Sequence, residues 1–111
     1  MDDPVVIINY ARTPIGAFQG ALSTLKSPQL GSVAIKASIQ RAGLTPEQIQ
    51  EVTMGCVLPA GLGQAPARQA ALGAGIPDVT PCATINKVCG SGMKAIMHEH
   101  DTLIAKKSEL Q

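Results

Sequence analysis

Three short apolar runs alternate with stretches of helical spacing along this chain, and this order constrains the fold more than any other feature. The runs cover Val5 to Asn9, Glu51 to Val57 and Ala83 to Val88. Short apolar strands that alternate with helices are typical of a parallel sheet with right-handed crossovers. The sequence therefore predicts an α/β fold with a mainly parallel sheet. Three strands are few for a sheet that needs cover on both faces and edges, so we expect an incomplete part of a larger fold.

Helix start signals mark the segments between the runs. Ser27 and Pro28 predict a helix with serine as the cap and proline in the first position, and Gly43 predicts its end. Thr45 and Gln48 have the spacing of a capping box, which predicts one further helical turn before the second run.

Two more helices are predicted in the second half of the chain. Pro66 opens a helical stretch over Ala67 to Leu72, and two glycines follow it. The last helix is expected from about Ser91 to Ala105 because apolar residues recur there in a stripe. The stripe consists of Met93, Ile96, Met97, Leu103 and Ile104.

The composition indicates a folded chain and argues against nucleic-acid binding. The 111 residues are 45% hydrophobic and 15% charged, which is typical of a packed globular interior. With one Phe, one Tyr and no Trp, the core has to be aliphatic. The net charge is +1 and the nine Lys and Arg residues are scattered, so no basic stripe for nucleic acid is present.

The three cysteines are Cys56, Cys82 and Cys89. The odd count and the absence of a CxxC pair favour neither a disulfide framework nor a zinc site, and no metal is expected. Reduced thiols indicate an intracellular compartment. The sequence begins without a charged-then-apolar leader, and no apolar run is long enough to cross a bilayer. We expect a cytoplasmic protein with no membrane contact.

The segment from Asn86 to Lys94 carries the main chemical signal. A predicted strand ends, Cys89 follows in a turn with Gly90 and Gly92, and a helix begins. Free N–H groups and partial positive charge at a helix start favour a thiolate, which is the nucleophilic form of cysteine. The same N–H groups can donate to the oxyanion that forms when a thioester carbonyl is attacked.

A structural role for each cysteine competes with this hypothesis. Free cysteine is among the most buried residue types, so Cys89 could be an inert core thiol. Cys82 falls within or just before a predicted strand and Cys56 lies near a strand end. Both lack the glycine turn and the helix start, so we expect both to be structural.

A cysteine nucleophile usually needs a base, and the two histidines do not supply one. His98 and His100 follow Cys89 by nine and eleven residues on the same predicted helix. At about 1.5 Å per residue they lie roughly 13–17 Å away, beyond hydrogen-bond reach. Their spacing also lacks the i, i+4 pattern of a zinc site. His100 continues the apolar stripe, so we expect a packed, hydrogen-bonded histidine.

The segment NKVCGSGMK, from Asn86 to Lys94, resembles the active-site segment of the thiolase family, and within it of the acetyl-CoA C-acetyltransferases. Ala11 to Gly16 resembles the loop after its first strand, and Gly63 to Ala71 resembles the loop and helix before its active-site strand. The similarity runs from about Pro4 to Ile104. Residues 1–111 then correspond to the N-terminal portion of a thiolase N-terminal domain, without the C-terminal domain.

The resemblance implies a reaction and a fold. Two acetyl-CoA molecules give acetoacetyl-CoA and CoA, or the reverse, with Cys89 accepting the acetyl group as a thioester. The backbone N–H of Cys89 would supply part of an oxyanion hole. No metal or prosthetic group is implied, because CoA is carried by the substrate. The family has two similar α/β halves and forms dimers or tetramers, so the full-length protein is expected to be a homodimer or homotetramer.

The chain also departs from the family. Thiolases are several times longer, and their Gly-His-Pro and Cys-Gly-Gly motifs do not occur here. The loops that hold most of the CoA are absent too, so the resemblance assigns no CoA-binding residue in this chain. We therefore expect little or no condensing activity from these 111 residues alone.

Three other functions stay open. The chain could be a non-catalytic truncated or split-protein fragment that needs a partner chain. A nucleotide-binding module is disfavoured, because Gly61 to Gly63 and Gly73 to Gly75 do not complete a dinucleotide fingerprint. The ketoacyl synthases also acylate a cysteine at a helix start, but the segment from Asn86 to Lys94 is less similar to theirs.

Overall fold

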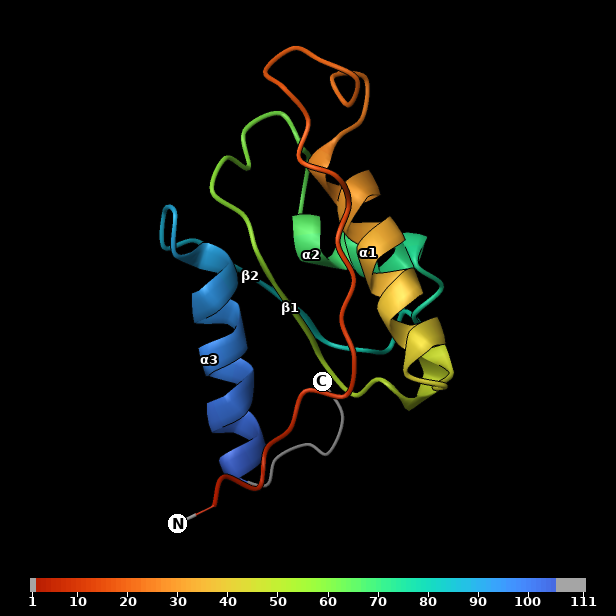
Figure 1. Ribbon diagram of the computed structural model, residues 1–111, viewed down its shortest axis with the longest axis vertical. Helices are drawn as coiled ribbons and strands as arrows, with labels where there is room; N and C mark the ends of the chain where they lie inside the picture. Colours follow the sequence, from red (N-terminus) through yellow and green to blue (C-terminus); the bar gives the residue numbers. More distant parts are fainter. Residues whose placement is uncertain (1, 106–111) are drawn as a thin grey trace.

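The structure, a computed structural model, describes residues 2–105 of the chain. The elements in order are α1 (Ser27–Arg41), a 3-10 turn η1 (Pro46–Gln48), β1 (Val52–Gly55), α2 (Pro66–Gly73), β2 (Cys82–Ile85) and α3 (Ser91–Ile104). The strands pair in parallel, with Val52 opposite Cys82 and Gly55 opposite Ile85. In Figure 1, α1 and α2 lie on one side of the strands and α3 lies on the other. This arrangement confirms the predicted α/β class with a parallel sheet.

The predicted helix starts are confirmed, with one shift. The backbone N–H of Thr45 donates to Gln48 Oε1 at 2.8 Å, as expected of the capping box. The first long helix begins at Ser27 itself, so Ser27 is not the cap. Lys26 occupies that position, and its backbone N–H donates to the Gln29 side chain at 2.7 Å.

The strand predicted over Val5 to Asn9 is wrong. Within residues 2–105 the sheet has two strands, and neither pairs with this run. Val6 and Ile7 are 73% and 77% exposed. A strand exists only with a hydrogen-bonded neighbour, and here side chains attach the segment instead. Asn9 Nδ2 donates to the Arg41 carbonyl at 3.1 Å, and the Arg41 guanidinium donates to the Tyr10 carbonyl at 3.1 Å.

The core is aliphatic, as the composition predicts, and lies between α1, α2 and the strands. Its buried members are Ile39, Ile49, Val52, Ala71 and Ile76. Small residues bring α1 and α2 together. A Cβ atom at Gly31 would lie 3.1 Å from the Cβ of Ala70. Ser32 Oγ donates to the Ala70 carbonyl at 2.8 Å, so a hydrogen bond reinforces the contact.

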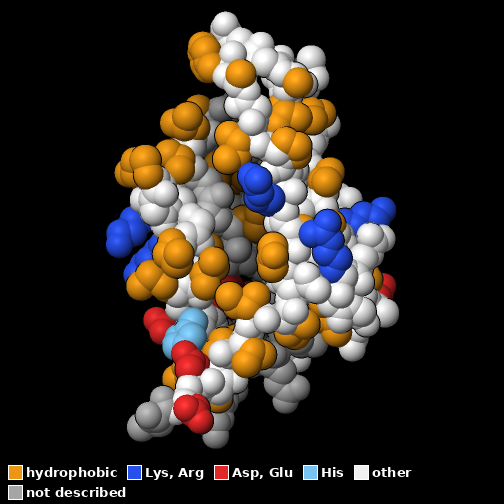
Figure 2. Space-filling view, in the orientation of Figure 1, with side chains coloured by type: hydrophobic (Ala, Val, Ile, Leu, Met, Phe, Trp, Pro, Cys, Tyr) orange, Lys and Arg blue, Asp and Glu red, His pale blue; other side chains and the backbone are white. Residues whose placement is uncertain are grey.

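The apolar stripe of the last helix does not face the sheet. Met93 and Ile96 are 64% and 55% exposed, while Ser91 and Ala95 are buried against the strands. Figure 2 shows apolar side chains gathered on the outer face of the molecule, over α3 and over the loop before α1. The small residues face the strands because the start of α3 lies very close to β1. A Cβ atom at Gly55 would lie 2.5 Å from backbone atoms of Ser91 and Gly92. Only small side chains fit at that contact.

None of the helices in residues 2–105 has the length and apolarity required to cross a membrane. The same part of the chain holds no group of three or more His, Cys, Asp or Glu side chains that could bind a metal ion.

Candidate functional site

Cys89 lies in the turn between the end of β2 and the start of α3, where the sequence predicts it. Its side chain is exposed to solvent. In Figure 1 this turn projects at one end of α3. Within residues 2–105, Cys89 is therefore not a buried core thiol.

The turn has a tight backbone. Gly90 N donates to the Lys87 carbonyl at 3.0 Å, and Ser91 N donates to the Val88 carbonyl at 3.1 Å. Val88 has a φ of +49°, in the left-handed region that a β-branched residue rarely adopts. Such a conformation costs about 1–3 kcal/mol and persists only where the surroundings enforce it.

Two polar side chains hold Val88 in this left-handed conformation. Ser91 Oγ accepts a hydrogen bond from Lys87 N at 2.8 Å and donates one to the Val88 carbonyl at 2.6 Å. Asn86 Oδ1 accepts from Val88 N at 3.0 Å, and Asn86 Nδ2 donates to the Val57 carbonyl at 3.1 Å. Asn86 thus attaches the turn to the loop after β1, and Ser91 attaches it to α3.

Sequence reasoning missed both of these residues. Asn and Ser side chains commonly bond the backbone within turns and at helix starts, so the signal was present in their spacing around Cys89. That signal does not show which backbone groups are bonded. Only the structure identifies the Val88 carbonyl as the common acceptor of Ser91 N and Ser91 Oγ.

The backbone N–H of Cys89 is an open donor. Among residues 2–105, no backbone or side-chain atom accepts a hydrogen bond from it. An exposed thiol beside an unoccupied N–H is the combination that attack on a thioester carbonyl needs, because the sulfur adds to carbon while the N–H receives the oxyanion.

The other two cysteines lie in less accessible places. Cys82 begins β2 and is half-buried, with its Sγ 3.4 Å from the Thr80 carbonyl oxygen. Burial raises the pKa of the Cys82 thiol, and the nearby positive charge of Arg68 partly opposes that effect. Cys56 is half-buried after β1, and its N–H donates to the Ile85 carbonyl at 2.9 Å.

The two histidines lie beyond the middle of α3, away from Cys89 at its start. His100 Nε2 is 2.7 Å from Asp3 Oδ2, and Nδ1 is 3.5 Å from Asp101 Oδ1. These hydrogen bonds raise the pKa of His100. The expectation of a hydrogen-bonded histidine is confirmed, but His100 is not packed in the core, since 38% of its side chain is exposed.

The side-chain carboxyl group of Glu99, a residue of α3, lies against β1. Thr53 Oγ1 donates to Glu99 Oε1, while Glu99 Oε2 is buried and has no hydrogen-bond partner. Burial raises the pKa of Glu99 to about 7, and the negative charge of Glu51 adds to the effect. Glu99 lies ten residues beyond Cys89 along the chain, so it is not placed to act as the base of Cys89.

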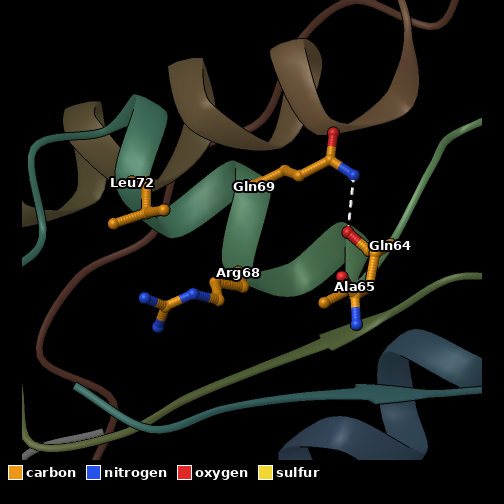
Figure 3. Close-up of a pocket in the computed structure, with 5 residues that line it drawn as sticks. All are labelled: Gln64, Ala65, Arg68, Gln69 and Leu72. Carbon is orange, nitrogen blue, oxygen red and sulfur yellow. Dashed lines mark hydrogen bonds between the residues drawn. The ribbon is translucent and has the colours of Figure 1, made fainter. Parts of the chain in front are cut away.

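A shallow pocket of about 370 Å³ is formed by α2 and the loop before it. Figure 3 shows the five lining residues, with the Gln69 side chain turned back toward the Gln64 carbonyl at 2.7 Å. A second hollow of about 390 Å³ lies between residues 11–15 and α1. Neither contains Cys89.

Comparison with known proteins gives a consistent family. The family described as "Thiolase, N-terminal domain" matches residues 5–111. The acetyl-CoA acetyltransferase of Cupriavidus necator is 54% identical over 106 residues, which cover 96% of this chain and 27% of that protein. The mitochondrial acetyl-CoA acetyltransferase of Xenopus tropicalis is 62% identical over 93 residues, which cover 84% of this chain and 22% of that protein.

A solved structure agrees with these relatives. The Acat5 thiolase from Ascaris suum, in complex with coenzyme A, superposes with a TM-score of 0.90 at 41% sequence identity. The match covers 92% of this chain and 27% of that one. The chain therefore spans about a quarter of the length of the relatives it matches.

Proposed function

The chain belongs to the thiolase family, and from this premise we propose that Cys89 is the acyl-accepting nucleophile of an acetyl-CoA C-acetyltransferase. The thiolate of Cys89 attacks the thioester carbonyl of acetyl-CoA, and the bond from carbonyl carbon to the CoA sulfur breaks. CoA leaves and takes up a proton, which produces an acetyl-Cys89 thioester. A second acetyl-CoA then loses an α-proton to a base that we assign to the rest of the whole protein, and its carbanion attacks the acetyl-Cys89 carbonyl. The bond from that carbonyl carbon to the Cys89 sulfur breaks, which gives acetoacetyl-CoA and regenerates the Cys89 thiolate.

The observation that carries this proposal is the exposed Cys89 side chain beside its own unoccupied N–H. The N–H receives the negative charge that develops on the carbonyl oxygen during each attack. The named relatives are acetyl-CoA acetyltransferases, and the solved thiolase was captured with coenzyme A, which supports an acyl-CoA substrate. The chemistry needs no metal or prosthetic group, since CoA arrives with the acyl group.

The complete reaction needs groups that we assign to the rest of the whole protein. The 111 residues contain neither a Gly-His-Pro nor a Cys-Gly-Gly motif, and His98 and His100 lie at a distance from Cys89 along α3. We propose that the isolated chain lacks condensing activity. We also propose that the whole protein is a homodimer or homotetramer. We propose a location in the cytoplasm, although the relative from Xenopus tropicalis is mitochondrial.

Acylation of the purified chain tests the nucleophile. After incubation with acetyl-CoA, peptide mass spectrometry should find one acetyl group on Cys89. Replacement of Cys89 by Ala should abolish it, while the matched variant Cys82→Ala should retain it. An acetyl group on Cys56 or Cys82 in the wild type, with Cys89 unmodified, would overturn the proposal. Steady formation of acetoacetyl-CoA by the isolated chain would overturn its proposed incompleteness.

A second candidate function is a non-catalytic fragment that acts only with a partner chain. It is favoured by the apolar residues exposed on α3, among them Met93, Ile96 and Met97, and by the unpaired run from Val5 to Asn9. Analytical ultracentrifugation separates the candidates. A folded monomer that is acetylated on Cys89 supports the catalytic one, while a chain that folds only with a partner supports the other.

A further inference from the structure

The carbonyl group of Val88 and the N–H of Cys89 belong to one peptide unit. A trans peptide is planar and its C=O and N–H point in opposite directions, so the orientation of one fixes that of the other. The Val88 carbonyl accepts hydrogen bonds from Ser91 N at 3.1 Å and from Ser91 Oγ at 2.6 Å. Both donors belong to the first residue of α3. The carbonyl is thereby held toward the helix, and the Cys89 N–H is directed away from it.

The hydroxyl of Ser91 uses its hydrogen and its oxygen in holding this turn. It has one hydrogen, which is donated to the Val88 carbonyl, and its oxygen accepts from Lys87 N at 2.8 Å. Ser91 is only 2% exposed, so water does not compete for either bond. The two bonds bracket the left-handed Val88, whose φ of +49° would otherwise relax and rotate the peptide.

We propose that Ser91 is a positioning residue, whose buried hydroxyl orients the N–H of Cys89 to receive the oxyanion during acyl transfer. The inference rests on the proposed function of Cys89. It goes beyond that function because it assigns the orientation of the Cys89 N–H to the buried side chain of another residue. It implies that the loss of the Ser91 hydroxyl slows acyl transfer to Cys89 more than it slows other reactions of the same thiol.

Two probes separate these effects. Attack of Cys89 on p-nitrophenyl acetate forms the sulfur–carbonyl bond, places negative charge on the carbonyl oxygen and breaks the ester bond to release p-nitrophenolate. Alkylation by iodoacetamide displaces iodide in one step and places no such charge. Both reactions are followed on the peptide that contains Cys89 by mass spectrometry. The ratio of the two rates therefore reports the oxyanion donor and cancels changes in the accessibility of the thiol.

In the full 111-residue chain, Ser91→Ala should lower this ratio about tenfold. The loss is smaller than the 10²–10³ of a deleted oxyanion donor, because Ser91 N still holds the Val88 carbonyl. Ser91→Thr keeps the hydroxyl and should restore most of the ratio. The matched control is Thr80→Ala, which removes another buried hydroxyl that is bonded to a backbone carbonyl away from Cys89. Its ratio should equal that of the wild type, whatever its stability.

An unchanged ratio in folded Ser91→Ala would overturn the role of Ser91. A wild-type chain that is alkylated but not acylated at Cys89 would overturn the proposed function instead. If Ser91→Ala does not fold, amide hydrogen exchange of the wild type decides. The Cys89 amide should exchange at nearly the unprotected rate, and the Lys87 amide should exchange at least tenfold more slowly than its own unprotected rate. Strong protection of the Cys89 amide would contradict the inference.

Discussion

Gly55 on β1 lies against the first turn of α3 so closely that a Cβ atom there would stand 2.5 Å from the backbone nitrogen of Gly92. The contact is between two main chains, so neither side can move aside as a flexible side chain would. It sets the height of α3 over the strands, and with it the position of the turn that carries Cys89.

Gly55→Ala should therefore destabilise the chain by about 1–3 kcal/mol, the cost of inserting a methyl group where backbone atoms must shift. Thermal unfolding followed by circular dichroism measures the effect. Gly92→Ala is the matched control, because a Cβ atom at Gly92 meets nothing within 4 Å. Equal melting temperatures for the two variants would show that α3 is not seated by this contact.

The three thiols should differ in their rates of alkylation. Cys89 is exposed, whereas Cys56 and Cys82 are half-buried, and burial raises the pKa of Cys82. Because the thiolate is the reactive form, iodoacetamide near pH 7 should label Cys89 first and Cys82 much more slowly. Peptide mass spectrometry over time gives the three rates. Denaturation in urea is the control, since it should make the rates similar. Comparable rates in the folded chain would refute the difference.

The stability of the chain should fall as pH rises, because of Glu99. Burial raises the folded-state pKa of Glu99 to about 7 from an ordinary value of 4.5. Between these two values the unfolded chain loses the proton while the folded chain keeps it, so the unfolded state binds fewer protons. The free energy of unfolding then decreases from about pH 4.5 to pH 7. Because Glu99 is partly accessible to solvent, we expect a loss on the order of 1 kcal/mol.

Glu99→Gln should remove this slope, since an amide can still bond Thr53 and does not ionise. Urea unfolding at pH 5, 6, 7 and 8 provides the comparison with the wild type. His100 also has a raised pKa, so its stabilising bond to Asp3 weakens as pH rises through that pKa, but it does so in both proteins. Glu47→Gln on the exposed η1 turn is the control. A parallel pH dependence in wild type and Glu99→Gln would exclude Glu99 as the cause.

The start of α2 depends on a side chain from β2. Thr84 Oγ1 accepts a hydrogen bond from Ala67 N at 3.1 Å, while the helix's own cap position, Ala65, has a φ of +51° and no side chain to accept one. Thr84→Val keeps the shape and removes the acceptor, so it should cost about 0.5–1 kcal/mol in urea unfolding. Thr102→Val, on an exposed part of α3, should cost less. The reverse order would contradict this capping role.

The sequence alone was sufficient for those elements whose signals are local. Pro66 at the start of α2 and the glycines around Cys89 marked helix boundaries and the strand-to-helix turn, because backbone conformation there depends on the residue itself. Thr45 and Gln48 marked the η1 turn in the same way.

What depends on distant partners was not predictable. Val5 to Asn9 has the composition of a strand, yet pairing requires a neighbour that a sequence pattern cannot supply. The stripe of Met93 and Ile96 predicts the helix but not the face of α3 that meets the strands, because the absent side chain of Gly55, more than thirty residues earlier, brings that face too close for large residues. The cap from Thr84 to α2 is hidden for the same reason.

The parallel pairing of β1 with β2 also has a kinetic consequence. Val52 meets Cys82 thirty positions later, and the hydrogen bond from Asn86 to Val57 closes a loop of similar length. The contact between Asp3 and His100 joins residues 97 positions apart. Chain closure becomes slower and entropically costlier with separation, so the strand–helix–strand unit should form before the N-terminal segment docks. The turn that carries Cys89 would then form early in folding, because it belongs to the unit whose contacts close the shorter loops.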